Sequence, residues 1–371
     1  MARSGQGGIQ SLLLIGGFAS KLKHYPLAFS GVFLIGIFAG LVSRSQPARQ
    51  IVSTDPTSAP DPGAAALVST TASRRAETAG NKGIRIWGDK GKGIRFASYN
   101  LKNYLMMSRE GEGAIVQRGP KPESEISVVV DTISQMRPEI LGVCEIGGMS
   151  EVEDLRARLR MRGVDYPQAE WVDAADEDRH LALLTTFSIV NRRSQTGLTY
   201  LLGDKEFPVQ RGFLDATISV NPKYQLRCIG VHLKSKRDVA EGEQDLMRRN
   251  EAHLLRRYLD EVLRAEPEVN LMVYGDFNDS CNEPVIRSIQ GLRGSPGYFG
   301  SIHLKDEHGE AWTHHWSSAD IYSRIDFLLY SRGLSPEIDH EHSFIYGRDD
   351  WEGGSDHRMI VAGIVPADRR R

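Results

Sequence analysis

Cysteine is scarce in this sequence. Its 371 residues include three cysteines, Cys144, Cys228 and Cys281, and no two of them are closely spaced. An odd count without short spacings excludes a disulfide framework and a cysteine-based zinc signature. Cys144 and Cys228 lie inside the apolar runs LGVCEI and LRCIGV, so we expect both to be small core residues.

The sequence also lacks a large surplus of charge, because its formal net charge is −2. Residues 1–93 hold 11 Lys/Arg against 4 Asp/Glu, a net of +7, and the remainder holds 35 against 44, a net of −9. An acidic main domain argues against a broad basic footprint for nucleic acid. It suits a divalent cation, which needs carboxylate ligands.

One long uncharged hydrophobic run, residues 26–43, follows a basic N-terminal segment, residues 1–25. Its 18 residues are near the shortest length that spans a bilayer. Two interpretations fit, a transmembrane anchor and the apolar part of a signal peptide. No small-x-small cleavage site follows, which favours the anchor. Both interpretations predict that the rest of the chain lies outside the cytoplasm, either membrane-anchored or, if the segment is cleaved, secreted.

Residues 44–92 are rich in Ala, Pro, Ser, Thr and Gly, which predicts a disordered linker. A single folded domain is predicted over residues 93–367, where strand-like and helix-like runs alternate. The expected strands are 94–101, 139–146, 181–190, 213–220, 224–233, 270–277, 324–331 and 359–365. Helices are expected over 123–137, from about 150 to 163, and over 241–265. Strand pairs joined by short turns, with few helices, favour an α/β layered sandwich with mixed sheets.

Polar residues suited to phosphate chemistry lie at or near the ends of these expected strands. They are Asn100 in ASYNLKN, Glu145 in GVCEIGG, His232 in GVHLKSKR, Asp276 and Asn278 in VYGDFND, Asp326 in RIDFLL, and Asp356 and His357 in GSDHRMI. Polar groups at the strand ends of one sandwich can converge on one crevice. The sequence therefore predicts a single site built from distant segments.

The order of these motifs resembles the endonuclease/exonuclease/phosphatase superfamily, which includes pancreatic deoxyribonuclease, neutral sphingomyelinases and inositol polyphosphate phosphatases. GDFN at 275–278 precedes SRIDF at 323–327 and GSDH at 354–357, after an early YN and Glu145. The resemblance covers roughly residues 94–365. It implies a four-layer α/β sandwich, with two mixed, mainly antiparallel sheets face to face and helices outside. It also implies divalent-metal-dependent phosphoester hydrolysis. One departure is Val-Cys-Glu where the superfamily usually has a hydrophobic residue, Gln and Glu.

Metal binding is assigned to Glu145, Asn100 and Asp356. Glu145 is a hard-oxygen ligand suited to Mg²⁺, which takes one or two protein carboxylates and keeps several waters. Mn²⁺ and Ca²⁺ are alternatives. Asn100 can bridge the metal shell and the phosphate, and the resemblance puts Asp356 near the metal side. The plainer alternatives are a solvated strand-end Glu and a turn Asn.

The resemblance implies that Asp276 orients or deprotonates the attacking water. Asn278, two residues on, should face the same side of an extended chain and contact phosphate or a second metal. For both residues the plainer alternative is an Asx turn. His357 is expected to stabilise charge or transfer a proton, with Asp326 as its orienting partner. His232 is a second candidate proton donor, or else a satisfied strand-end histidine.

Arg211 and Lys234 are the candidate substrate contacts beside Asn278. Arg211 resembles a superfamily arginine that meets backbone phosphate. Lys234 begins a short basic run with Lys236 and Arg237, which suits a phosphate backbone or a solvated loop. Trp312 and Trp316 could stack on a base or fill the core, and we favour the core.

These features predict a Mg²⁺-dependent phosphodiester hydrolase in which metal-activated water attacks phosphorus, most simply a nuclease that acts as an endonuclease on nucleic acid. A lipid phosphodiesterase or a phosphomonoesterase is the alternative, because one centre serves several substrates. The third hypothesis is a non-catalytic binding protein on the same fold. The predicted partners are the phosphodiester substrate and a membrane at residues 26–43, without a protein partner.

Overall fold

The computed structural model describes residues 93–110, 116–237, 239–240, 242–347 and 350–368. The predicted N-terminal segment, membrane segment and linker, residues 1–92, lie outside the described residues. Among the helices that the structure describes, none combines the length and the apolar character needed to cross a membrane. The membrane segment therefore stays a prediction from sequence.

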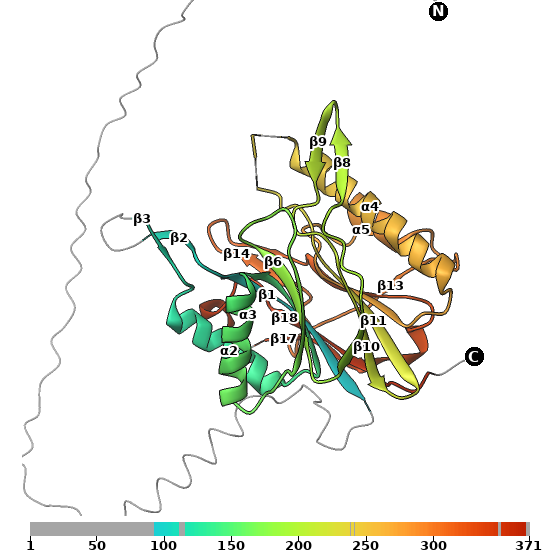
Figure 1. The fold of residues 1–371 in the computed structure, drawn as a ribbon, viewed down its shortest axis with the longest axis horizontal. Coiled ribbons are helices and arrows are strands. Elements are labelled where there is room, and N and C mark those ends of the chain that lie inside the picture. Colours follow the sequence, from blue (N-terminus) through green and yellow to red (C-terminus); the bar gives the residue numbers. More distant parts are fainter. Residues whose placement is uncertain (1–92, 111–115, 238, 241, 348–349, 369–371) are drawn as a thin grey trace, which may run out of the picture. The chain divides into compact units, whose positions relative to one another are not determined.

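Two six-stranded sheets form the centre of the domain (Figure 1). The first runs, in spatial order, β17 (Ile338–Tyr346), β18 (Met359–Ile364), β1 (Ile94–Tyr104), β4 (Ile140–Ile146), β6 (His180–Thr185) and β5 (Gln168–Val172). The second runs β13 (Gly300–Ser301), β16 (Asp326–Tyr330), β12 (Leu271–Asp276), β11 (Tyr224–His232), β10 (Leu214–Asn221) and β7 (Ser188–Arg192). Only β1 with β4 and β11 with β12 pair in parallel among these described strands. The sheets are mixed and mainly antiparallel, as predicted.

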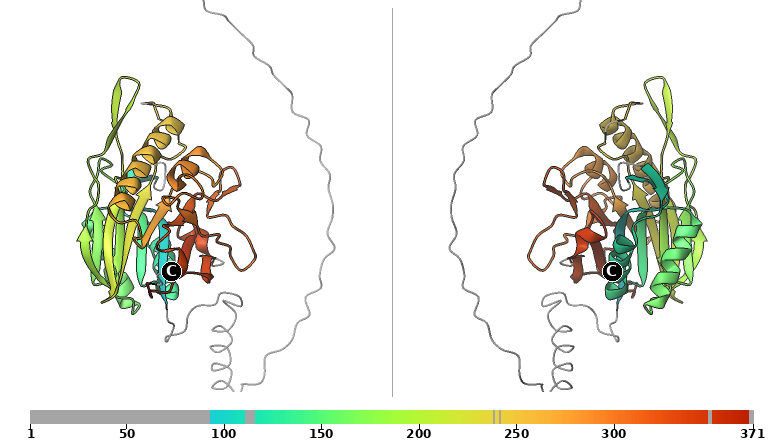
Figure 2. Two further views of the ribbon diagram at one scale, coloured as in Figure 1. Left: turned by 90° about the vertical axis from the view of Figure 1, so that its right-hand side faces the viewer. Right: turned by 90° about the vertical axis from the view of Figure 1, so that its left-hand side faces the viewer.

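Helices cover the outer face of each sheet, so that four layers result (Figures 1 and 2). Helices α2 (Glu123–Met136) and α3 (Met149–Met161) share a buried cluster with β1, β4 and β6. Helices α4 (Gln244–Ala265) and α5 (Pro284–Gln290) share another with β11, β12 and β16. A third cluster lies between the sheets. The predicted four-layer α/β sandwich is confirmed.

The alternation of side chains along each strand explains why both faces of a sheet are apolar. In β12, Met272 and Tyr274 face the cluster between the sheets, whereas Leu271 and Val273 face the helices. Successive strand residues point to opposite faces, so a strand covered on both sides has to be apolar throughout. This is why LMVY reads as an unbroken hydrophobic run, and why a polar group is tolerated only where the strand ends.

One predicted strand is wrong. Residues 181–190 were expected to form one strand, but β6 ends at Thr185 in the first sheet and β7 begins at Ser188 in the second. The hydroxyl of Thr185 accepts a hydrogen bond from the Phe187 backbone N–H at 3.1 Å, which stabilises the bend between them. The antiparallel pair β10–β11, expected from its Asn-Pro-Lys turn, is confirmed.

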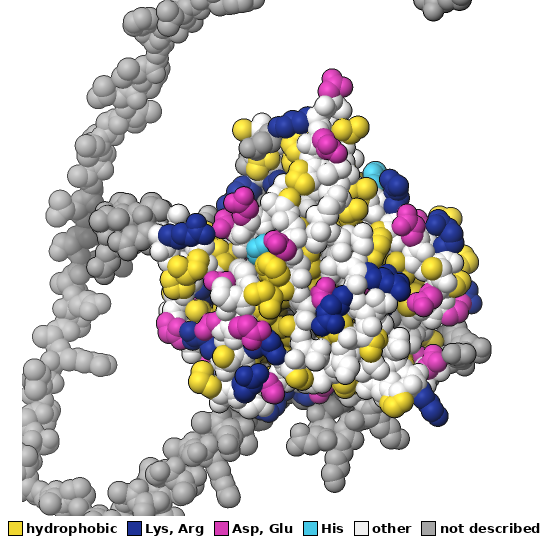
Figure 3. Space-filling model, in the orientation of Figure 1, with side chains coloured by type: hydrophobic (Ala, Val, Ile, Leu, Met, Phe, Trp, Pro, Cys, Tyr) yellow, Lys and Arg dark blue, Asp and Glu magenta, His cyan; other side chains and the backbone are white. Residues whose placement is uncertain are grey.

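Three small hairpins extend from the upper half of the molecule in Figure 1. They are β2 (Met107–Glu110) with β3 (Val116–Gly119), β8 (Thr199–Leu202) with β9 (Lys205–Pro208), and β14 (His314–Trp316) with β15 (Ile321–Ser323). Figure 3 shows hydrophobic and charged side chains together on the projecting β8–β9 hairpin. The core position expected for Trp316 is wrong, because 55% of this residue is exposed on β14–β15. Trp312 is half-buried.

Candidate active site

The candidate site lies where strands from both sheets end. In the second sheet, Asp276 is directly opposite His232 on β11 and Asp326 on β16. In the first sheet, Asn100 on β1 pairs with Cys144 on β4, beside Glu145. Parallel neighbours end at the same edge of a sheet, and β16 begins where β12 ends. The two sheets therefore bring their polar termini together at one end of the sandwich.

Asp276 is the centre of this arrangement. Its Oδ2 accepts a hydrogen bond from Asn100 Nδ2 at 3.2 Å and lies 3.7 Å from Nε2 of both His232 and His357. Its Oδ1 accepts a hydrogen bond from the Asn278 backbone N–H at 2.9 Å. Burial raises the pKa of Asp276 to about 7; the nearby His357 opposes this shift, and Asp326 adds to it. One carboxylate thus touches residues from four separate segments.

His357 is held by a carboxylate on its other side. Its Nδ1 lies 2.9 Å from Asp326 Oδ2, which also accepts a hydrogen bond from Thr313 Oγ1 at 2.6 Å. Burial by itself lowers the pKa of His357, but Asp326 and Asp276 outweigh this and raise the pKa to about 10. The two carboxylates therefore favour the charged form of His357 at neutral pH.

His232 has the opposite electrostatic environment. Burial, together with the positive charges of Arg211 and His357, lowers its pKa well below the usual value. Its Nε2 lies 3.8 Å from Glu145 Oε1, and its Nδ1 is buried without a hydrogen-bond partner among the described residues. The site thus contains one neutral and one charged imidazole, which can take different parts in proton transfer.

Glu145 stands on strained backbone. Its φ of +59° is in the left-handed region that non-glycine residues rarely adopt. Its Oε2 accepts a hydrogen bond from the Asn103 backbone N–H at 3.0 Å, while Oε1 faces His232. Strain of this kind persists only where the surrounding structure imposes it, and it often marks a functional site.

The carboxylates of this site suit a cation. Asp326 and Glu145 each raise the pKa of Asp276, so negative charge is concentrated here without full compensation. Asp276, Asp326 and His357 present ligand atoms within 4.8 Å of one another. The hydrogen bond between Asp326 and His357 already explains that proximity, and Mg²⁺ prefers oxygen. Glu145 is the better hard-oxygen candidate for a divalent ion, and Asn100 Oδ1, which accepts a hydrogen bond from the Lys102 backbone N–H at 3.0 Å, keeps a second lone pair.

Two predicted residues lie differently from expectation. Asn278 does not continue an extended strand, because β12 ends at Asp276 and Asn278 has a φ of +52°. Its backbone N–H forms the Asx turn with Asp276, and its Nδ2 donates to the Leu233 carbonyl at 2.9 Å. Asp356 is half-buried. Its charge raises the pKa of His357. Burial lowers the pKa of His314, and the charge of Asp356 counteracts that shift. Asp356 therefore lies beside both histidines, and its part in metal binding stays a prediction.

The two predicted cationic substrate contacts both lie close to protein acceptors, although Arg211 Nε is in an ion pair without a hydrogen bond. Arg211 Nε lies 3.1 Å from Asp176 Oδ2, and the arginine side chain is 12% exposed. Lys234 is buried and its Nζ donates to the Ser235 and Arg237 carbonyls at 3.5 and 3.4 Å. Burial, reinforced by Arg211, lowers the pKa of Lys234. Lys236, in contrast, is exposed and pairs with Asp279 at 3.1 Å.

Several site residues were missed from sequence. Thr313 hydrogen-bonds Asp326, the ring of His314 lies 4.7 Å from that of His357, and Arg179 Nε donates to Asn103 Oδ1 at 2.8 Å. Thr313 and His314 lie in the segment THHW, where a Thr before two histidines carries no signal of its own. Arg179 lies outside every motif, so only the fold brings it to the site.

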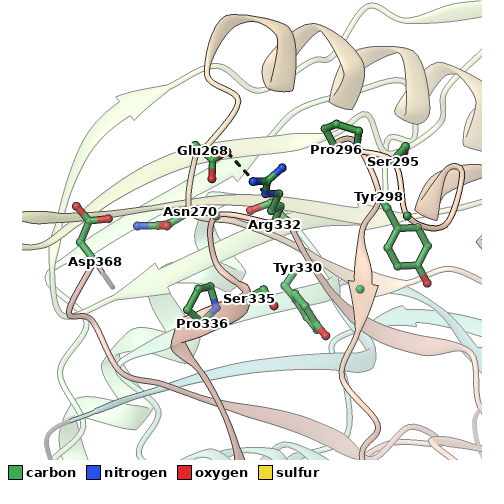
Figure 4. Close-up of a pocket in the computed structure, with 14 residues that line it drawn as sticks. Glu268, Asn270, Ser295, Pro296, Tyr298, Tyr330, Arg332, Ser335, Pro336 and Asp368 are labelled. Atoms are coloured by element: carbon green, nitrogen blue, oxygen red, sulfur yellow. Dashed lines mark ion pairs between the residues drawn. The ribbon is translucent and has the colours of Figure 1, made fainter. Parts of the chain in front are cut away.

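A separate hollow of about 860 Å³ lies at the opposite end of the second sheet (Figure 4). Its lining includes Tyr298, Tyr330 and Arg332, and Arg332 pairs with Glu268 at 3.8 Å. Tyr330 ends β16, whereas Asp326 begins it. None of the predicted site residues lines this hollow, which is therefore distinct from the candidate site.

Comparison with known proteins agrees with this geometry. The model of the Endonuclease/Exonuclease/phosphatase family matches residues 98–357. No curated protein matches the sequence. Among solved structures, the human Nocturnin catalytic domain with bound sulfate is 18% identical, with a TM-score of 0.52, and the match covers 74% of this chain and 95% of that one.

Two further structures have the same fold. Sphingomyelinase C from Streptomyces griseocarneus is 14% identical, with a TM-score of 0.50 and coverage of 73% of this chain and 99% of that one. Truncated TDP2 from Caenorhabditis elegans is 13% identical, with a TM-score of 0.50 and coverage of 73% and 97%. At these identities the likeness establishes the fold and not the substrate.

Proposed function

Because this chain belongs to the Endonuclease/Exonuclease/phosphatase family of phosphoesterases, we propose that it is a Mg²⁺-dependent phosphodiester hydrolase. The observation that carries this proposal is the position of Asp276. Its Oδ2 lies within 3.7 Å of Asn100, His232 and His357, and His357 is supported from behind by Asp326. A base beside a charged acid suits in-line attack on phosphorus.

Each residue then has a distinct part. Glu145 and Asn100 would hold the ion, which when bound neutralises phosphate oxygens and makes a water molecule more acidic. Asp276 orients the water and accepts its proton. The His357 cation donates a hydrogen bond to a non-bridging phosphate oxygen, where negative charge develops. Neutral His232 offers Nε2 to the leaving oxygen or to the phosphate, and Asn278 braces the loop that carries Asp276.

The nuclease predicted from sequence is the first substrate candidate by resemblance. Its cationic contacts are weaker than expected, since Arg211 and Lys234 are paired or buried and Lys236 pairs with Asp279. A lipid phosphodiester is the second candidate, and a specific observation favours it: large hydrophobic side chains are exposed on the hairpin that touches His357. A phosphomonoesterase and a non-catalytic binding protein are the remaining alternatives from sequence.

A substrate panel on the full chain tests the proposal. We expect hydrolysis of a water-soluble aryl phosphodiester with Mg²⁺ and none with chelator, with plasmid DNA, RNA, sphingomyelin and inositol phosphates measured alongside. Asp276→Ala should lower turnover at least 10²-fold and leave the thermal melt nearly unchanged. The exposed Asp260→Ala on α4 is the matched control. Full turnover in Asp276→Ala, or full activity with chelator, would contradict the proposed centre.

A further inference from the structure

Exposed hydrophobic side chains are concentrated at the catalytic end of the sandwich. Of the ten large hydrophobic residues exposed in the described part of the chain, seven lie on segments that enter or leave this end. They are Met106, Met149, Leu201, Leu246, Trp316, Ile321 and Tyr322. Met106 follows β1, Met149 opens α3 after β4, and Leu246 is in the first turn of α4 after β11. Isolated exposed hydrophobics are common, but a set around one site indicates an interaction surface.

The β14–β15 hairpin connects this surface to the catalytic histidine. His314 forms a backbone bridge with His357, and their rings lie 4.7 Å apart. The backbone N–H of His315 also donates to the Asp356 carbonyl at 3.0 Å. Trp316 is two residues beyond His314 on the same strand, a spacing of roughly 7 Å. An exposed indole thus stands roughly 10 Å from the histidine that is to meet phosphate.

The hairpin carries its exposed apolar side chains next to a packed aromatic base, at the strand ends before the turn of Ser317 to Asp320. Tyr322 stacks on His315 with ring centroids 4.2 Å apart and meets the edge of Trp312 at 4.9 Å. Trp312 in turn contacts Trp351 and lies under the guanidinium of Arg358. Trp316 and Ile321 pair across the two strands beside Tyr322, whose packed ring loses little conformational freedom on binding. These residues are 55%, 49% and 50% exposed.

We propose that the catalytic end docks on the surface of a zwitterionic phospholipid bilayer, with Trp316 and Ile321 entering the interface, and that the substrate phosphodiester belongs to a lipid. This inference rests on the proposed phosphodiester hydrolysis. A lipid phosphate lies at the boundary between water and hydrocarbon, where Trp and Tyr are favoured. When the hairpin is docked, the phosphodiester of a lipid at that boundary would lie next to the hairpin and close to His357.

The negative charge around the hairpin favours a zwitterionic lipid surface over nucleic acid as the partner. Carboxylates surround the hairpin: Asp320 and Glu352 flank His315, and Glu310 accepts a hydrogen bond from Trp312. A polyanionic backbone would be repelled there, whereas a zwitterionic surface carries no net charge. Aliphatic tips such as Ile321 and Leu201 can enter an interface but cannot stack on a base. Independently, the sequence predicts a membrane segment at residues 26–43, outside the described residues.

Fluorescence quenching by lipid tests the docking without depending on catalysis. The full chain is mixed with phosphatidylcholine vesicles that carry brominated or ordinary acyl chains, and wild type is compared with Trp316→Phe. The difference between the two proteins reports Trp316 alone, whatever residues 26–43 do. We expect this component to be quenched by at least a third in the brominated vesicles. Vesicle-bound protein without that quenching, or quenching by a single-stranded oligonucleotide instead, would overturn the proposal.

A rate ratio tests the consequence for the substrate. The ratio is the hydrolysis rate on sphingomyelin or phosphatidylcholine vesicles divided by the rate on a water-soluble phosphodiester. In the double variant Trp316→Ser/Ile321→Ser, this ratio should fall at least tenfold. Leu292→Ser, exposed beyond α5, is the control that keeps both rates. An unchanged ratio would overturn the proposal. If Trp316 is quenched but no phosphodiester is cleaved, the docking holds and the proposed hydrolysis fails, so the two failures are distinguishable.

Discussion

Asp326 holds His357 in place from the side opposite Asp276. The distance from Asp326 Oδ2 to His357 Nδ1 is 2.9 Å, and both residues are buried. The same oxygen accepts a hydrogen bond from Thr313, which fixes the carboxylate. The carboxylate therefore both orients the imidazole and keeps it charged, so that Nε2 faces Asp276 as a donor.

We expect Asp326→Asn to lower turnover by about 10²–10⁴-fold, because the neutral amide cannot hold His357 as a cation in this orientation. The melting temperature should change little, since an amide can keep the contact with Thr313. Asp339→Asn is a matched control: Asp339 contacts His342 Nδ1 at 2.9 Å on β17, far from the site. Near-normal turnover in Asp326→Asn, measured on a soluble phosphodiester, would rule out this role.

Glu145 should contribute to metal binding and not to the stability of the fold. In Glu145→Gly, relief of the left-handed backbone, about 1–2 kcal/mol, offsets the lost hydrogen bond to Asn103. The free energy of unfolding in chelator should therefore change by less than about 1 kcal/mol. Mg²⁺ affinity, measured by calorimetry, should fall more than tenfold. Arg137→Gly, at a φ of +50°, is the control that keeps Mg²⁺ affinity; undiminished affinity in Glu145→Gly would refute the assignment.

Tyr274 packs on Gly142 of the opposite sheet and on Gly230 of the neighbouring strand in its own sheet. A Cβ on either glycine would collide with its ring. Its hydroxyl is buried without a hydrogen-bond partner among the described residues. Tyr274→Phe should therefore leave the free energy of unfolding unchanged or raise it by about 1 kcal/mol, whereas Gly142→Ala should lower it by about 1–3 kcal/mol. Urea denaturation measures both, and a large loss in Tyr274→Phe would mean that the hydroxyl is bonded.

Glu251 makes stability depend on pH. Burial raises its pKa to about 7, and the positive charges of Arg211, Lys234 and Arg248 counteract the shift only in part. Because the folded pKa exceeds the unfolded value, the folded state binds the extra proton. The contribution is full below about pH 4.5 and is lost as the pH rises through about 7.

Glu251→Gln should remove this dependence. Relative to wild type, the variant should gain on the order of 1–3 kcal/mol of unfolding free energy between pH 4.5 and 8. In the wild type, Glu251 Oε2 accepts a hydrogen bond from the Lys234 backbone N–H at 2.7 Å, and the amide oxygen of the variant can still accept it. Glu261→Gln, exposed on the same helix, is the control. Parallel stability curves for wild type and Glu251→Gln from pH 4.5 to 8 would show that Glu251 ionises normally.

Local patterns predicted the strands and helices that are apolar on the expected faces. The helix at 123–137 and the β10–β11 pair follow directly from spacing and a turn signal. The break within residues 181–190 was missed, because an apolar run looks the same whether it stays in one sheet or crosses to the other. Asn278 was predicted on an extended chain, but the Asx turn with Asp276 changes its backbone to the left-handed region.

The sequence by itself determined the layered α/β class and the set of polar strand ends, because periodicity and motif order are local properties of the chain. Only the tertiary structure decided which of those groups meet. Asn100 and Asp276 are 176 residues apart and share a hydrogen bond because two sheets end at the same place. It also decided that Arg211 and Lys234 are engaged by the protein and that Trp316 is exposed. Burial and pairing depend on neighbours that the chain supplies from a distance, so no local pattern encodes them.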